Sequence, residues 1–333
     1  TMTNRERFTA ALNGKTADRL PVVEWASWWD KTLSEWQKQG LDAKWNADKL
    51  YDYYGLDDLV QLWVNHRMPG FPKPMQHGHG IMQDEGDYER LKKMMFSEEY
   101  MHQCMQYFRN IKSQHEAGDF TLWYTIEGFF WFPRTLFGIE NHLYAFYDYP
   151  ELMHRINQDQ TDYVLMFLEE MYKVVTPDFM TFAEDMSYNH GPMLSKDCYD
   201  EFIKPYYQKI IPFIKSKGTK VFIDTDGDVE PLIPWFQEAG IEGVLPLERQ
   251  AGVDVNRIRR NYPEWLMIGG YDKTIMHLGE ENMRAEFERL LPAMRSGRYI
   301  PSVDHQTPPD VTLDNYKIYV SLLKEYAQKA MQK

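Results

Sequence analysis

The sequence predicts an α/β protein built as a (β/α)8 barrel, the TIM-barrel fold. Eight short apolar segments occur along its 333 residues, and helix-like stretches separate most of them. Strands that alternate with helices form βα units and a parallel sheet, and eight such units close a barrel. Nearly all eight segments end in acidic or histidine residues. Because barrel enzymes place their chemistry where the strands end, the same residues predict both the fold and the site.

The predicted strands carry the residues of the candidate site at their ends. In chain order they are Leu20–Trp25, Asp58–Val64, Phe120–Ile126, Phe179–Asp185, Val221–Asp224, Gly243–Leu247, Leu266–Gly270 and Tyr299–Val303. Apolar periodicity, with glycine or proline at several ends, predicts the helices between them. These are Asn4–Asn13, Thr32–Gln39, Glu99–Ala117, two helices within Glu140–Val174, helices across Lys196–Lys217, Val229–Ala239, Val255–Asn261, helices within Lys273–Arg295, and Thr312–Gln332.

One segment, Arg67–Gly86, departs from the alternation of strands and helices. It is rich in glycine and proline and predicts a long irregular excursion, which in many proteins is a functional lid. Its HGHG run at residues 77–80 is expected to lie away from the strand ends, so we do not predict a metal site there. No linker-like composition divides the chain, and we expect a single domain over residues 1–333.

Composition narrows the classes of function. The net charge is −13 and the pI is about 5.3, which argues against partners such as nucleic acid or an anionic membrane. Two cysteines, Cys104 and Cys198, provide neither a disulfide framework nor a thiolate metal cluster. With neither a signal-like start nor a long apolar run, we expect a cytoplasmic protein.

The strongest pattern is a set of carboxylates and one imidazole that follow three of the predicted strands. FIDTDGD carries Asp224 and Asp226, PLE ends in Glu248, and SVDHQTPPD carries His305. In a barrel these side chains would meet at one mouth. Such a set can hold zinc or a related divalent ion and leave a coordination position open. The sequence therefore predicts a metal site of Asp224, Asp226, Glu248 and His305, with Asp226 and His305 also catalytic.

Two other interpretations of this pattern stay open. The carboxylates and His305 can form a metal-free site that works by proton transfer. They can also be structural, because an Asp-Gly pair shapes turns, Asp228 can cap the following helix, and His305 can bond the backbone of a turn before two prolines.

A second acidic pair, Glu184 and Asp185, ends the strand predicted at Phe179–Asp185. Neighbouring side chains on a strand point to opposite sides, so one carboxylate should face the mouth and the other the surrounding helices. We predict a catalytic role for Glu184, which would orient the substrate or support the metal. A helix cap or a surface ion pair is the competing interpretation.

Aromatic residues gather in two further segments, WASWWD at Trp25–Asp30 and EGFFWFPRTLFG at Glu127–Gly138. Aromatic side chains build flat apolar walls for ring-shaped ligands. We therefore predict a substrate pocket formed by Trp28, Trp29, Phe130 and Trp131. Core packing beneath a long loop would explain the same residues.

Several of these segments resemble one known family. They are NRERFTAALNGKTADRLPV at Asn4–Val22, AEDMSYNHGPMLS at Ala183–Ser195, and the run from DTDGDVEPLIPWFQEAGIEGVLPLE through MIGGYDKT to YIPSVDHQTPPDV, which ends at Val311. On these motifs the chain is similar to the uroporphyrinogen decarboxylase superfamily over nearly its whole length. The resemblance independently implies the (β/α)8 barrel.

The resemblance also implies two chemistries. One branch decarboxylates uroporphyrinogen without a cofactor and holds the substrate carboxylates with an arginine-rich loop after the first strand. The equivalent stretch here, EWASWWDKTLSEW, has no arginine, although Asp57 or Asp58 could match that branch's early aspartate. The other branch moves methyl groups to or from corrinoid proteins, usually with zinc held by an H-x-C motif and a second cysteine. Here Asp224-Thr225-Asp226 and His305 stand at those places.

From the resemblance we expect a zinc-dependent methyltransferase that passes a methyl group from a small donor, an aromatic methyl ether, to a corrinoid protein. The Arg67–Gly86 excursion would help to dock that partner. A metal-free decarboxylase and a non-catalytic barrel that binds a corrinoid or another ligand are the alternatives. The direction of transfer and the oligomeric state, a homodimer among the options, are not determined by the sequence.

Overall fold

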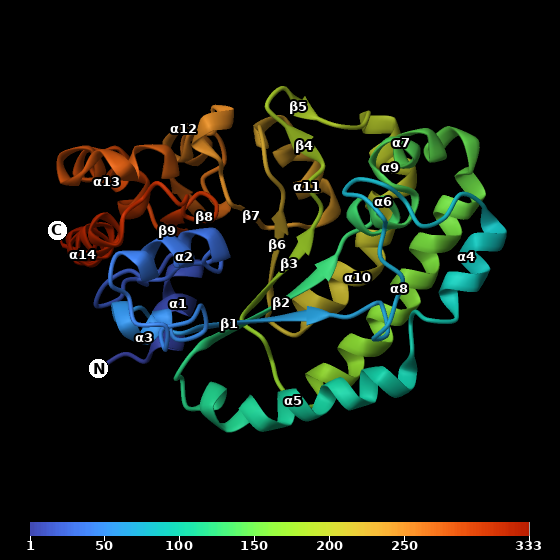
Figure 1. Ribbon diagram of the computed structural model, residues 1–333, viewed down its shortest axis with the longest axis horizontal. Coiled ribbons are helices and arrows are strands. Elements are labelled where there is room, and N and C mark those ends of the chain that lie inside the picture. The colour runs from blue at the N-terminus through green and yellow to red at the C-terminus, as the bar shows by residue number, and fades with distance from the viewer. Residues whose placement is uncertain (333) are drawn as a thin grey trace.

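A curled parallel sheet forms the centre of the protein in a computed structural model, which describes residues 1–332 (Figure 1). The order of its strands is β1-β2-β3-β6-β7-β8-β9, and every pair of neighbours is parallel. The bounds are β1 Leu59–Val64, β2 Thr121–Glu127, β3 Phe179–Ala183, β6 Lys220–Asp224, β7 Gly243–Leu245, β8 Leu266–Tyr271 and β9 Tyr299–Val303. The predicted TIM-barrel-like α/β class is confirmed.

The first predicted strand, Leu20–Trp25, is wrong as a strand. The segment is extended and mostly buried, and it lies between β9 and the start of β1, but it pairs with neither in a ladder. Side chains accept two of its N–H groups: the Val22 N–H donates to Asp57 Oδ2 at 3.1 Å, and the Trp25 N–H donates to Ser302 Oγ at 3.2 Å. Pro21 also removes one donor that a ladder would need. The seven remaining predicted strands form within a few residues of their expected bounds.

The helices pack on the outside of the curled sheet and lie in two groups in Figure 1. Their bounds are α1 Asn4–Leu12, α2 Asp30–Lys38, α3 Leu50–Tyr54, α4 Glu85–Lys92, α5 Glu98–Glu116, α6 Trp131–Phe137, α7 Ile139–Asp148, α8 Pro150–Tyr172, α9 Lys196–Phe202, α10 Lys204–Ser216, α11 Ile233–Ala239, α12 Val255–Asn261, α13 Glu280–Arg295 and α14 Leu313–Lys329. Short 3₁₀ turns occupy Glu230–Leu232, Arg249–Ala251 and Lys273–Leu278, and a two-residue-per-strand hairpin joins β4 Ser187–Tyr188 to β5 Gly191–Pro192.

Local chemistry explains where several helices begin. Hydroxyl caps start α1, α5 and α14: the side chains of Thr3, Ser97 and Thr312 each accept a backbone N–H three residues ahead at 3.1 Å. Proline at the first position of α8 fits a helix start, because no intrahelical partner is lost there. The predicted break at Pro150 is therefore confirmed, with α7 ending at Asp148.

Three helices, α3, α4 and α6, were not predicted from the sequence. Among residues 1–332, no helix combines the length and the apolar character that a membrane crossing requires. The expectation of a single domain stays a prediction.

Candidate active site

The predicted metal ligands come together at the carboxyl ends of neighbouring strands. Asp185 follows β3, Asp224 ends β6 and Asp226 lies two residues beyond it. One carboxylate oxygen from each of these three residues lies within 4.8 Å of the other two. We call Asp185, Asp224 and Asp226 the acidic cluster. It contains two of the four predicted ligands. It also contains Asp185, although the sequence predicted only that either Glu184 or Asp185 would face the mouth.

The other two predicted ligands, Glu248 and His305, lie beside the cluster. His305 Nε2 is 3.7 Å from Asp226 Oδ2, and Glu248 Oε1 accepts the Gly227 N–H at 3.4 Å. Lys273 Nζ lies 3.9 Å from Glu248 Oε2 and 3.6 Å from the buried Asp304 Oδ1, so one cation stands close to these acids. The four predicted residues thus share one site.

Burial and mutual repulsion shape the protonation of this site. Burial, with the nearby charges of Asp185 and Glu248, raises the pKa of Asp224 to about 8. Burial and the same two neighbours also raise the pKa of Asp226 far above its ordinary value. Burial lowers the pKa of His305, and the charge of Glu248 opposes that shift. Without a cation, the cluster therefore holds protons that exposed aspartates would have released at neutral pH.

We expect the metal-free protein to lose stability as pH rises from about 6.5 to about 8, above the range in which the buried histidines His66 and His142, whose pKa values burial lowers, act in the opposite direction. In this window the unfolded chain has released the Asp224 proton while the folded chain still holds it, so unfolding releases protons and higher pH favours unfolding. Burial raises the pKa of Glu24 to about 8 and that of Glu184 to about 7, which acts in the same direction. Urea unfolding at several pH values in the presence of a chelator measures the effect.

Asp224→Asn provides the control for this pH dependence. It removes one of the titrating groups, so the fall in stability should become shallower than in the unmodified protein. A free energy of unfolding that rises over the same pH range would contradict the protonation assigned to the site.

Glu184 faces the start of α6 rather than the acidic cluster, and its catalytic role stays a prediction. Its side chain is 1% exposed, and the carboxylate accepts the backbone N–H groups of Phe129 at 3.1 Å and of Phe130 and Trp131 at 2.9 Å. The Tyr207 hydroxyl donates to it as well. We call this arrangement the Glu184 clasp, and it fixes the start of α6 to the end of β3. A Cβ at Gly128 would lie 1.9 Å from the Glu184 carboxyl carbon, so only glycine permits the approach.

The backbone explains why the neighbouring residue faces the mouth. Asp185 has φ +48, a left-handed conformation that is uncommon outside glycine, asparagine and aspartate. The side chain of Asp185 accepts the Asp226 N–H at 3.3 Å, which links the two loops of the acidic cluster. The expectation that one of the two carboxylates faces the mouth is confirmed, with Asp185 in that position.

Among the four predicted pocket aromatics, the structure places Trp131 at a cavity and the other three elsewhere. Trp28 is 4% exposed and packs on Tyr51 and Tyr316, and Phe130 is fully buried against His142. Trp29 is exposed before α2, with Lys31 Nζ 5.0 Å from its ring. Trp28 and Phe130 were expected in the pocket and are core residues, because their rings fill space between helices that the sequence could not place together.

A cavity of about 780 Å³ opens at the same end of the sheet. Asp185 and Asp226 line it together with Trp131, so it reaches the acidic cluster. The excursion forms another wall, with Phe71, Pro72, Lys73, His77 and His79 among its lining residues. The expectation that the HGHG run lies away from the strand ends is therefore wrong. The Ile81 and Met82 N–H groups bond the Leu136 carbonyl at 2.9 and 3.1 Å and fold the excursion over the mouth.

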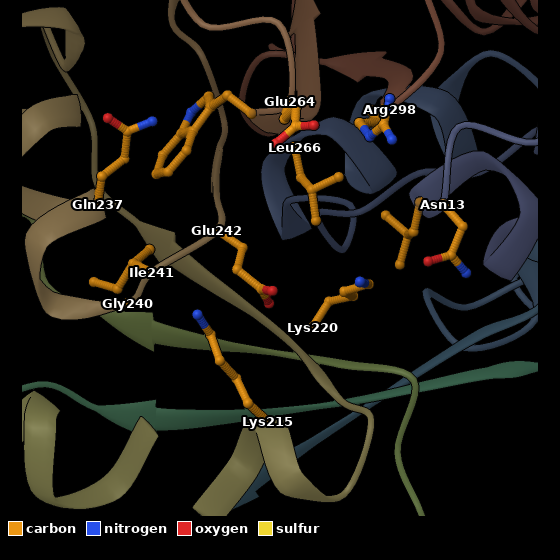
Figure 2. Close-up of a pocket in the computed structure, with 12 residues that line it drawn as sticks. Asn13, Lys215, Lys220, Gln237, Gly240, Ile241, Glu242, Glu264, Leu266 and Arg298 are labelled. Atoms are coloured by element: carbon orange, nitrogen blue, oxygen red, sulfur yellow. The ribbon is translucent and has the colours of Figure 1, made fainter. Parts of the chain in front are cut away.

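A second cavity, of about 390 Å³, lies at the opposite end of the strands (Figure 2). Lys220 opens β6, Glu242 precedes β7 and Arg298 precedes β9, and all three line it. Barrels keep their chemistry at the carboxyl ends of the strands, and no predicted site residue lines this cavity. We assign the active site to the larger cavity.

Sequence reasoning missed several residues at the site. Trp25, rather than the two tryptophans after it, lies beside His305 with ring centroids 6.1 Å apart. Lys273 follows β8 in the motif MIGGYDKT, so its place at a strand end was a usable signal. Arg134 also lines the larger cavity, but it lies on α6, a helix that was not predicted from the sequence.

Comparison with known sequences finds relatives of one family. Residues 79–326 match the family model described as Uroporphyrinogen decarboxylase (URO-D). The uroporphyrinogen decarboxylase of Hydrogenobaculum sp. is 28% identical over 140 residues, which cover 40% of this chain and 38% of that protein. That of Ruthia magnifica is 20% identical over 185 residues, 55% of this chain and 52% of that protein. The chain thus matches about half or less of the length of these relatives.

Comparison with solved structures finds the same fold in an enzyme of another name. The methyltransferase from Methanosarcina mazei is similar over 98% of this chain and 99% of its own, with a TM-score of 0.65 and 16% sequence identity. At that identity the likeness shows a shared fold and does not by itself show a shared function.

Proposed function

This chain belongs to the uroporphyrinogen decarboxylase family, and within it we propose that the protein is a methyltransferase. It would move a methyl group from a small donor, an aromatic methyl ether, to a corrinoid protein. One observation carries the proposal: three strand-end carboxylates and His305 meet beside a partly apolar cavity that Trp131 lines. Such a site suits one small donor with an aromatic body and an ether oxygen.

The residues present fit a divalent metal. Three carboxylate oxygens within 4.8 Å of one another, with an imidazole nitrogen next to them, form an oxygen and nitrogen donor set of the kind that zinc or manganese accepts. Burial and repulsion raise the pKa values of Asp224 and Asp226, and a bound cation would offset both effects. Asp185, Asp224, Asp226 and His305 would hold the ion. When bound, it would polarise the ether oxygen as a Lewis acid.

The protein's own groups would position the donor. Trp131 Nε1 donates to Glu127 Oε1 at 3.2 Å, which fixes the ring of Trp131 as a wall of the cavity. Ile139 and Met193 add apolar surface that excludes water from the donor. An aryl oxygen that loses its methyl group becomes a phenolate, an anion that the site would have to accommodate. The excursion, which forms the outer wall, is the surface that a corrinoid partner would meet.

We expect purified protein loaded with zinc to convert a methoxylated aromatic and reduced cobalamin into the phenol and methylcobalamin. Free cobalamin stands in for the partner's corrinoid, and absorbance follows the product. A chelator should abolish the reaction and zinc should restore it, because the acidic cluster alone cannot polarise the ether. Failure of methylcobalamin to form with any methoxylated aromatic would refute the proposal.

Decarboxylation is the second candidate, because the family model and the curated relatives carry that name. Carboxylic acids that stay protonated near neutral pH could also protonate a carbanion. The site argues against the family's own substrate: Asp57 lies before β1, at the far end of the sheet, and is ion-paired with Arg19 at 2.8 Å. Carbon dioxide release from a smaller acid without cobalamin would select this candidate. Corrinoid binding without any turnover would select a non-catalytic barrel.

A further inference from the structure

Two arginines line the large cavity, and they differ in how their charges are matched. Arg67 pairs with the carboxylate of Glu127 and also donates to Thr135 Oγ1 at 2.6 Å. Its counter-charge therefore comes from the protein. A ligand would have to compete with Glu127 for it.

Arg134 has no such counter-charge. Its Nη1 donates to the Asp185 carbonyl at 3.0 Å and its Nη2 faces the Glu184 carbonyl at 3.4 Å. Within residues 1–332 this guanidinium forms no ion pair, although the chain carries 50 acidic residues against 37 basic ones. Burial lowers the pKa of Arg134, and the charges of Asp185 and Glu184 oppose that shift. Neither carboxylate forms an ion pair with the guanidinium.

The surroundings of Arg134 hold it in place. The guanidinium carbon lies 4.7 Å from the centre of the Trp131 ring and 5.1 Å from that of Phe130, so the group contacts two aromatic rings. The Glu184 clasp fixes the start of the same helix. Arg134 is thus a preorganised cation in the wall that also carries Trp131.

Arg134 is half-buried, and a partly desolvated guanidinium without an ion pair is unfavourable. A carboxylate is the group that matches its planar donors. We propose that Arg134 binds a carboxylate on the methyl donor, so that the substrate class is a methoxylated aromatic acid. This inference rests on the proposed function and names its substrate. The acid would place its carboxylate on Arg134 and its ring on Trp131, with the methoxy group toward Asp226.

The experiment compares 3-methoxybenzoate with 3-methoxybenzamide, which has nearly the same shape without the charge. We expect calorimetric titration of the zinc-loaded protein to show roughly 10- to 100-fold tighter binding of the benzoate, the range of a charge-assisted hydrogen bond. Arg134→Met should remove this preference, and Arg134→Lys should retain part of it. Lys73→Met removes an exposed cation of the same cavity and should keep the preference within about threefold.

Each result decides the inference separately from the proposed function. Equal affinity for the two compounds, no binding of the benzoate, or a preference that survives Arg134→Met would overturn it. If Arg134→Met does not fold, the test uses two other measurements. These are the preference of the unmodified protein for the benzoate over the benzamide and the partial loss of that preference in Arg134→Lys. Binding requires no methyl transfer, so selective binding without methylcobalamin would refute the methyltransferase and leave the assignment of Arg134 standing.

Discussion

Asp226→Asn is expected to lower methyl transfer at least about 100-fold and, in the same protein without metal, to increase stability at pH 8. Asp226 is the member of the acidic cluster that also faces His305, so its loss should weaken both metal binding and the reactive geometry. The same carboxylate is repelled by Asp185 and Glu248, which raise its pKa together with burial. At pH 8 the unfolded chain gains free energy by ionising Asp226 while the folded chain largely keeps its proton, and asparagine removes that gain. Steady-state transfer, metal content and urea unfolding measure the three effects.

Asp228→Asn is the matched control. Asp228 lies two residues further along the same loop and accepts the Glu230 N–H at 3.3 Å, outside the acidic cluster. It should retain its metal and nearly all of its activity. If Asp226→Asn binds metal as the unmodified protein does, Asp226 is not a ligand. If it is less stable at pH 8 without metal, the repulsion assigned to the cluster is wrong.

Glu184→Ala is expected to destabilise the protein by about 3–5 kcal/mol, the cost of breaking a buried charged network. The change leaves three backbone N–H groups and the Tyr207 hydroxyl without their acceptor. It also removes an anion from the start of α6, where the helix dipole favours negative charge. Glu184→Gln keeps one acceptor oxygen and should cost about half as much. Urea unfolding gives the free energies.

Glu201→Ala serves as the surface control for the Glu184 clasp. Its carboxylate on α9 is 60% exposed and pairs with His154, so its loss should change stability by less than about 0.5 kcal/mol. A cost below 1 kcal/mol for Glu184→Ala would show that the clasp does not hold α6. If Glu184→Ala loses transfer activity but keeps its stability, the result would support a catalytic role for Glu184.

The strands and their acidic ends were predictable because both are local features. Seven of the eight strand segments form, since apolar runs between helical stretches fix parallel strands largely by themselves. Leu20–Trp25 fails because two of its backbone N–H groups donate to Asp57 and Ser302, partners 35 and 277 residues away along the chain. No local pattern could reveal that competition.

The orientation of side chains was harder to predict from the sequence. Alternation along a strand predicted that Glu184 and Asp185 would diverge, but which one faces the mouth depends on the left-handed turn at Asp185 and on the N–H groups that α6 presents to Glu184. Trp28 and Phe130 were expected at the pocket from composition alone. Their burial depends on how α3, α7 and α14 pack, and this is a property of the assembled barrel.

The excursion over the mouth has a consequence for how such a protein diversifies. Its residues 67–80 include no fully buried side chain, yet several of them form a wall of the cavity. The opposite wall is anchored through Glu184 to the barrel itself. Substitutions in the outer wall can therefore alter which molecules are admitted at little cost to folding. During evolution, substitutions in this loop can change substrate specificity while the reactive centre stays the same.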